Sequence, residues 1–492
     1  MKFNYRSVFL WTLLAGCLAL LIIFILHFIQ SAGQPQIEYS DGIMMYGIKL
    51  TMSHGWAWNL SGPPHMVQFY PPIGYWSYGI VCQIFGYSYL VARIFQLCLF
   101  TGCLAFIFLI VKYFTKNNLI ALIAALLPFT QPVMAFWTIY IRFDILAILF
   151  ELAALYVVLK CQKSRWVFLA VPLFVLAVYT KQSMVSGAIA AIVYLFLQNK
   201  KKAMGFAGTY AVVVAGIMGI GCLLTHGAFF KEMITYQRTS PFLYPVVDAF
   251  SIGFSFAIFF IPVIFLAAVY VWHNRRNLFS FYAIAAIVVN LSASLKPGSN
   301  IYYLYPSLMA LSICAGLELS RIFKKPSTVL ESLELSDKKE RSVYPAVIYT
   351  FLGFYLVASI VAFNSFPSQT PGKQYDADYK YAESLISDAT YPILTESVGI
   401  VIDAGKTPYL DEPFVFKNFA ALGIWSDAKM LSDLTTGKIE YVIAAHDLPY
   451  YVNPIDVRFS AAVQNDIVAN YHIVYDCSDI PFGFVIYKAN KK

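Results

Sequence analysis

The chain has 492 residues, of which 59% are hydrophobic and only 13% are charged, and its formal net charge is +8. Soluble domains carry about 25% charged residues, and a soluble protein of this length has too much surface to cover with so few charges. The composition excludes an ordinary soluble protein and predicts that lipid surrounds most of the chain.

Apolar runs of about 20 residues, long enough to cross a bilayer, recur through most of the chain. They predict a mainly α fold, a polytopic bundle of about eleven transmembrane helices. The predicted spans are 8–29, 88–111, 118–137, 141–159, 165–180, 183–198, 204–225, 250–272, 278–295, 300–320 and 344–364.

The basic residues between these spans predict the orientation. Cytoplasmic loops are enriched in Lys and Arg, which places Lys2 and Arg6 in the cytoplasm. With eleven spans, every basic cluster falls on that same side: Lys112 and Lys116; Lys160, Lys163 and Arg165; Lys200, Lys201 and Lys202; Arg275 and Arg276; and Lys324, Lys325, Lys338, Lys339 and Arg341. We expect an integral protein of a bacterial inner membrane, with the N-terminus in the cytoplasm and the C-terminal domain outside.

Two regions are predicted to lie outside the bilayer. In the first outer loop, residues 42–54 and 71–86 resemble amphipathic helices on the membrane surface. Residues 366–492 carry 10 Lys+Arg and 16 Asp+Glu, against 25 and 11 in residues 1–365. This shift predicts a transmembrane domain over 1–365 and a small extracytoplasmic α/β domain over 366–492. In the latter we expect a helix at 377–388 and strands at 391–395, 398–403, 440–445, 471–475 and 483–488.

Acidic residues at the outer ends of the spans are the first candidates for a site. Asp41 follows the first span, and Glu38 precedes it by three residues. A carboxylate there can be a general base or a metal ligand, and the alternative is a solvated loop acid or a helix N-cap. Asp144 and Glu151 share one face of a predicted span, where a structural ion pair competes with a site role.

Four cations lie at the outer ends of separate spans, where the topology rule disfavours positive charge: Arg93, Arg142, Lys181 and Lys296. An anionic ligand such as a phosphate would explain them, because Arg and Lys bind such groups through charge-assisted hydrogen bonds. For any single residue the alternative is snorkelling to the lipid headgroups. One of His54, His65 and His226 in the outer loops could join Asp41 on a metal, although no metal-binding spacing is present.

The same segments resemble membrane-embedded glycosyltransferases of the C-type fold, namely the protein O-mannosyltransferases and the bacterial aminoarabinose transferases of lipid A. The ordered motifs are YSDG at 39–42, YPPIGYW at 70–76, VARIF at 91–95, IRFD at 141–144, YTKQS at 179–183 and KPGSNIYYLYP at 296–306. They extend over most of residues 1–365. Many relatives have an adjacent acidic pair at the first motif, whereas this chain has Asp41 followed by Gly42.

The resemblance implies a hexosyl- or pentosyltransferase that uses a polyprenyl-phosphate sugar, with a lipid, glycan or protein acceptor and no nucleic acid. By this likeness Asp41 is the catalytic base of an inverting transfer, with Glu38 as a candidate second carboxylate. Arg93, Arg142, Lys181 and Lys296 would hold the donor phosphate, and Asp144, Glu151, Tyr70 and His65 would support the site. No cofactor is implied with certainty, and a divalent cation is left open.

Two other functions compete with the enzyme. A transporter or flippase of a lipid-linked saccharide also needs cations at the outer face, but usually shows internal symmetry, which the sequence lacks. A scaffold of an envelope assembly would leave Asp41 and the outer cations unexplained as a set.

Overall fold

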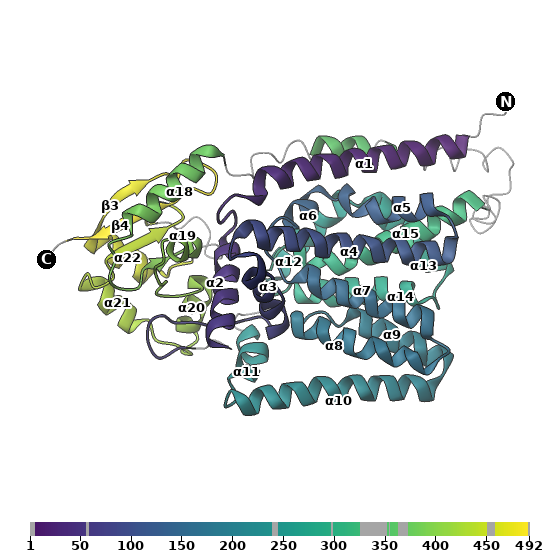
Figure 1. Cartoon of the computed structure of the whole chain (residues 1–492), viewed down its shortest axis with the longest axis horizontal. Helices are drawn as coiled ribbons and strands as arrows, with labels where there is room; N and C mark the ends of the chain where they lie inside the picture. The colour runs from purple at the N-terminus through teal and green to yellow at the C-terminus, as the bar shows by residue number, and fades with distance from the viewer. Residues whose placement is uncertain are drawn as a thin grey trace.

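The computed structural model describes residues 5–55, 59–238, 245–296, 299–324, 352–353, 355–362, 372–449 and 458–490. These residues form an elongated bundle of helices with a smaller domain of helices and strands at one end (Figure 1). The mainly α fold with a small α/β domain is therefore as predicted. The domain boundary at 365/366 lies outside the described residues.

The bundle contains helices of unequal length, several of them broken by short turns. They are α1 (Tyr5–Ala32), α4 (Tyr89–Thr115), α5 (Asn118–Leu126), α6 (Pro132–Trp137), α7 (Asp144–Cys161), α8 (Ala170–Thr180), α9 (Ser186–Gln198), α10 (Lys200–Leu224), α11 (Ala228–Phe230), α12 (Pro245–Ile258), α13 (Ile261–His273), α14 (Leu278–Ala293) and α15 (Tyr305–Lys324). The short 3-10 or π turns are η1 (Leu127–Thr130), η2 (Arg165–Leu169), η3 (Lys231–Thr235), η4 (Tyr236–Arg238) and η5 (Ile301–Leu304). Each of the first ten predicted spans coincides with one or more of these helices.

The helices of the bundle fall into two groups by length. Four are long and apolar enough to cross a membrane, namely Val8–Ala32, Tyr89–Thr115, Lys200–Leu224 and Ile301–Phe323, and the pair Phe250–Ile258 and Ile261–His273 is bent by 95°. Shorter apolar helices make up most of the rest, so the chain is an integral membrane protein while the number eleven stays a prediction. Of the predicted span 344–364, residues 352–353 and 355–362 are described, and they are helical.

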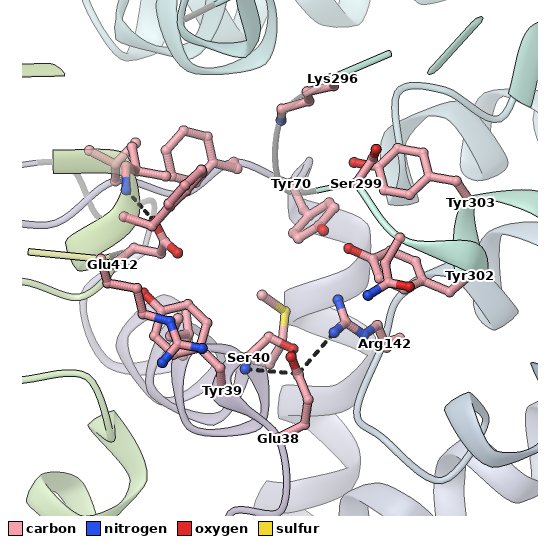
Figure 2. Close-up of a pocket in the computed structure, with 18 of the residues that line it drawn as sticks. Glu38, Tyr39, Ser40, Tyr70, Arg142, Lys296, Ser299, Tyr302, Tyr303 and Glu412 are labelled. Atoms are coloured by element: carbon pink, nitrogen blue, oxygen red, sulfur yellow. Dashed lines mark hydrogen bonds and ion pairs between the residues drawn. The ribbon is translucent and has the colours of Figure 1, made fainter. Parts of the chain in front are cut away.

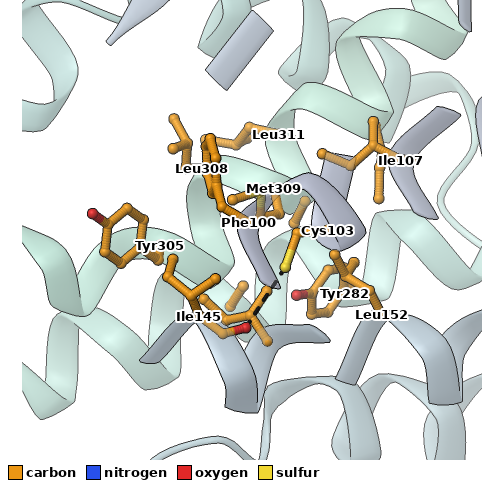
Figure 3. Packing of buried hydrophobic residues seen from close by; sticks show 14 of the residues in the cluster. Phe100, Cys103, Ile107, Ile145, Leu152, Tyr282, Tyr305, Leu308, Met309 and Leu311 are labelled. Atoms are coloured by element: carbon orange, nitrogen blue, oxygen red, sulfur yellow. Dashed lines mark hydrogen bonds between the residues drawn. The ribbon is translucent and has the colours of Figure 1, made fainter. Parts of the chain in front are cut away.

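The centre of the bundle is packed from helices that are distant in sequence. Phe100, Cys103 and Ile107 of α4 meet Ile145 and Leu152 of α7 (Figure 3). The other sides are closed by α14 and α15 through Tyr282, Tyr305, Leu308, Met309 and Leu311. This close packing fixes the ends of α7 and α14, from which site residues extend.

Two helices of the first loop lie where the bundle meets the C-terminal domain. They are α2 (Tyr39–His54) and α3 (Pro72–Phe85), which match the predicted surface helices closely. Pro72 at the first position of α3 suits a helix start, because proline has no N–H to leave unpaired there. In Figure 1, α2 runs along the face of the bundle that the C-terminal domain covers.

The C-terminal domain has a four-stranded sheet in the order β1-β2-β4-β3, with β1 parallel to β2 and the other pairs antiparallel. Its strands are β1 (Leu394–Thr395), β2 (Tyr441–Ala444), β3 (Tyr471–Asp476) and β4 (Val485–Ala489). Its helices are α18 (Lys373–Leu385), α19 (Val398–Asp403), α20 (Pro413–Ala421), α21 (Ala428–Thr435) and α22 (Ala461–Asn470).

One predicted strand of this domain is wrong. Residues 398–403 form helix α19, although their run of Val and Ile favours a strand. A short apolar run has the same appearance in a buried helix and in a buried strand. Here the run forms a helix, and α19 packs against α2 where Gly399 approaches Gly42.

Candidate functional site

A cavity of about 320 Å³ lies between the bundle and the C-terminal domain. The bundle side and the first loop contribute charged, hydroxyl and aromatic side chains, and the C-terminal domain closes the opposite wall (Figure 2). The lining residues are Glu38, Tyr39, Ser40, Ile43, Met44, Val67, Phe69, Tyr70, Tyr75, Arg142, Tyr236, Lys296, Ser299, Asn300, Tyr302, Tyr303, Glu412, Phe414, Val415, Asn418 and Arg458.

Glu38 is a carboxylate that faces this cavity. It is the N-cap of α2, where its Oε2 accepts hydrogen bonds from the backbone N–H of Ser40 at 2.9 Å and from the Ser40 hydroxyl. The same oxygen accepts a hydrogen bond from Nη2 of Arg142 at 2.9 Å. The Glu38 carboxylate thus contacts both the N-terminus of α2 and the Arg142 guanidinium, two groups that attract negative charge.

Asp41, in the first turn of α2, is fully buried and does not line the cavity. Its Oδ2 accepts hydrogen bonds from Nη2 of Arg93 at 2.8 Å and from the backbone N–H of Ile37 at 3.3 Å, and its Oδ1 accepts one from the N–H of Ile141 at 2.9 Å. The side chain has no exposed surface. The structure therefore places Asp41, the base predicted from the sequence, among structural contacts and outside the cavity lining.

Arg93 is equally enclosed. Besides Asp41, its guanidinium donates hydrogen bonds to the backbone carbonyls of Ser31, Ala32, Gln34 and Pro35, at the end of α1. Ser31 and Ala32 form the last turn of α1 and Gln34 and Pro35 follow it, and a buried cation suits the partial negative charge at a helix C-terminus. Arg93 thus joins α1, α2 and α4, and the cavity does not include it.

Residue 42, directly after Asp41, has no room for a side chain larger than that of glycine. A Cβ at Gly42 would lie 2.3 Å from the backbone nitrogen of Gly399 in α19, and 2.3 Å from Oε1 of Gln36. That amide oxygen accepts a hydrogen bond from the N–H of Gly399 at 2.6 Å. An acidic side chain at position 42 would therefore collide with the C-terminal domain.

The remaining predicted cations differ in their access to the cavity. Arg142 and Lys296 line it, and the Arg142 guanidinium lies 4.0 Å from the centre of the Tyr302 ring. Lys181 stands behind them, paired with Asp144 and 4.1 Å from the centre of the Tyr303 ring. Burial and the nearby Lys181 lower the pKa of Lys296 to about 8, from an ordinary value of 10.5.

Tyr70 lines the cavity as predicted, whereas Glu151 and His65 lie elsewhere. Glu151 is buried in the bundle and accepts hydrogen bonds from the Ser186 hydroxyl at 2.9 Å, the Gly187 N–H and the Tyr282 hydroxyl at 3.0 Å. This network connects α7, α9 and α14, as expected for a structural role.

His65 is buried among aromatic rings of the C-terminal domain, with ring centres 5.5 Å from Tyr409 and 5.2 Å from Trp425. Burial lowers its pKa. In the parts of the chain that the structure describes, no group of three or more His, Cys, Asp or Glu residues could hold a metal ion.

Two charged residues of the cavity were missed in the sequence: Glu412 and Arg458, both from the C-terminal domain. Glu412 is the N-cap of α20 and accepts a hydrogen bond from the N–H of Val415 at 2.6 Å. The Arg458 guanidinium lies 3.9 Å from the centre of the Tyr39 ring. An acid before Pro413 could have indicated a helix start, but no local pattern says that this helix end faces the bundle.

Comparisons with known proteins agree with this geometry. Residues 70–226 match the model of the family described as dolichyl-phosphate-mannose-protein mannosyltransferase. The whole chain is similar in structure to ArnT from Cupriavidus metallidurans bound to undecaprenyl phosphate, with a TM-score of 0.63 and 11% identity, covering 100% of both chains. The apo form of that ArnT gives a TM-score of 0.62 at 11% identity over 96% of this chain and 97% of that one.

Another solved structure is similar with a lower TM-score. The archaeal oligosaccharyltransferase AglB from Archaeoglobus fulgidus, in complex with an inhibitory peptide and a dolichol-phosphate, matches with a TM-score of 0.53 and 14% identity over 90% of this chain and 70% of that one. A comparison with curated protein sequences gave no match. The resemblance to the membrane-embedded C-type glycosyltransferase fold is therefore confirmed.

Proposed function

We propose that this chain is an integral membrane glycosyltransferase that moves a sugar from a polyprenyl-phosphate donor to an acceptor hydroxyl at the extracytoplasmic face. One observation carries the proposal: within the C-type fold, a cavity brings together the carboxylate of Glu38 and the cations Arg142 and Lys296. A base and a phosphate site are the two parts that such a transfer needs.

The reaction assigned to this cavity has balanced charges. The acceptor hydroxyl gives its proton to a carboxylate, and its oxygen attacks the anomeric carbon with inversion. The bond from that carbon to the phosphate oxygen breaks, and its electron pair leaves with the polyprenyl phosphate. The phosphate gains one negative charge, which Arg142 and Lys296 stabilise at the moment it forms.

We infer that Glu38 is the base, in place of Asp41. Glu38 lines the cavity and is partly exposed, whereas each oxygen of Asp41 already accepts a hydrogen bond from a buried donor. For Asp41 to act, the Arg93 contacts would have to open. Asp41 is assigned the role of a positioning residue, because its bond to the N–H of Ile141 fixes the chain next to Arg142.

The transporter alternative draws on the bend of 95° between the helices at 250–258 and 261–273, since transporters use broken helices. That break is held by side chains of the bundle: Gln131 donates to the carbonyls of Ser255 and Phe256. A bend that is fixed by such hydrogen bonds favours a rigid bundle over the alternating access of a transporter.

The test is transfer in proteoliposomes, with labelled undecaprenyl-phosphate and dolichyl-phosphate sugars and total membrane lipids as acceptors. Sugar transfer by the wild-type protein would support the glycosyltransferase function. If the protein moved intact lipid-linked sugar between leaflets and transferred sugar from none of the donors, the result would support a transporter and contradict the glycosyltransferase function.

A further inference from the structure

The wall of the cavity formed by the C-terminal domain contains a carboxylate that the proposed reaction does not use. Glu412 lies across the cavity from Arg142, Tyr302 and Tyr303 (Figure 2). Burial raises the pKa of its carboxyl group above the ordinary value, and Arg458 and Lys296 oppose this effect. Its Oε2 accepts the N–H of Val415, and the Tyr39 hydroxyl lies near the carboxyl group, whose two oxygens offer about four acceptor positions; the group can therefore accept a further donor from the cavity.

Both walls of the cavity carry charged groups. The bundle supplies Arg142 and Lys296, the cations suited to a phosphate, whereas Glu412, Phe414 and Asn418 come from the opposite wall together with Arg458, which lies over the Tyr39 ring. A volume of about 320 Å³ is at the lower end of the range for small-molecule sites. A phosphate held by the bundle cations therefore directs the group that it carries toward the C-terminal domain.

We propose that Glu412 is a specificity-determining residue that accepts hydrogen bonds from hydroxyl groups of the transferred sugar, so that the C-terminal domain selects the donor sugar. This inference rests on the proposed function. A carboxylate is a strong acceptor for hydroxyl groups, and Phe414 beside it offers an apolar surface to a sugar ring. A site with a buried polar partner rejects ligands that leave this partner unpaired.

The variant Glu412→Gln tests whether Glu412 recognises the sugar or only caps helix α20. The glutamine carbonyl oxygen can still accept the N–H of Val415, so a residue that only caps α20 would tolerate the change. The matched control is Glu440→Gln, in the same domain. Glu440 accepts hydrogen bonds from the N–H and the hydroxyl of Thr390, and it does not line the cavity.

The experiment uses the full chain in proteoliposomes and competes undecaprenyl-phosphate mannose, glucose and galactose, which differ in single hydroxyl groups. For Glu412→Gln we expect the preference between sugars to fall by about 10- to 100-fold, the range of a hydrogen bond to a charged group. Affinity for undecaprenyl phosphate without a sugar should stay within about twofold, and Glu440→Gln should resemble the wild type in both respects.

Unchanged sugar preference in Glu412→Gln, with normal transfer by the wild type, would overturn this inference alone. A changed KM for the acceptor with an intact donor preference would also overturn it, because Glu412 would then contact the acceptor. If the wild type neither transferred a sugar nor bound undecaprenyl phosphate, the proposed function would fail and this inference with it.

Discussion

Two ion pairs start from the same turn of α2 and have different surroundings. Glu38 and Arg142 meet at the cavity, where 23% of the Glu38 side chain is exposed, while Asp41 and Arg93 do not line the cavity and have no exposed surface. Breaking a buried pair leaves an uncompensated charge, whereas a pair beside a cavity can exchange its partner for a ligand. The Glu38–Arg142 pair is therefore suited to catalysis, and the Asp41–Arg93 pair to stabilising the fold.

The largest expected effect is on stability, in Arg93→Gln. Removing the guanidinium takes from Asp41 its cationic partner and from the carbonyls at the end of α1 a shared donor. We expect a loss of roughly 3–5 kcal/mol of folding free energy, the usual cost of breaking a buried pair. The measurement is the midpoint of thermal denaturation in detergent. A midpoint equal to that of the wild type would contradict a structural role for this pair.

Arg142→Gln should show the opposite pattern. Its loss removes a cation from the cavity, and we expect transfer to fall by about 10²- to 10³-fold, as for other donors that stabilise a developing charge. The denaturation midpoint should remain close to that of the wild type, because Glu38 keeps its bonds to Ser40. Equal losses of stability in both arginine variants would remove the distinction between the two pairs.

The pH dependence tests the second cavity cation. The pKa of Lys296 is lowered to about 8, so the ammonium is charged below this pH and neutral above it. If Lys296 holds the phosphate, kcat/KM for the donor should fall above pH 8, because this ratio reports the free enzyme. In Lys296→Arg the fall should move beyond the accessible range, since a guanidinium stays charged. A wild-type profile that is flat to pH 9.5 would exclude this role.

The smallest effect is expected for Glu151→Gln. Its carboxyl group accepts three hydrogen bonds inside the bundle, and the amide can keep most of them. We expect a loss of about 1 kcal/mol of stability and unchanged transfer at a temperature where the variant is folded. A strong loss of transfer without a change in the denaturation midpoint would show that Glu151 acts in the reaction.

Composition and periodicity predicted the class of fold, the surface helices of the first loop and the polar residues that gather at one end of the bundle. They did not predict which of the two carboxylates reaches the cavity, because Glu38 and Asp41 are one helical turn apart and both follow the same span. Nor could they predict Glu412 and Arg458, which belong to the C-terminal domain and line the cavity where this domain meets the bundle. Long-range packing of this kind leaves no local pattern in the sequence.

The most direct test compares Glu38→Gln with Asp41→Asn in the proteoliposome transfer assay, with the amounts matched to equal folded protein. A general base contributes about 10²- to 10⁴-fold, so Glu38→Gln should lose transfer by this factor while its denaturation midpoint stays near that of the wild type. Asp41→Asn should lose stability first and keep measurable transfer per folded molecule. Complete loss in folded Asp41→Asn, with activity retained in Glu38→Gln, would contradict the assignment and return the base to Asp41.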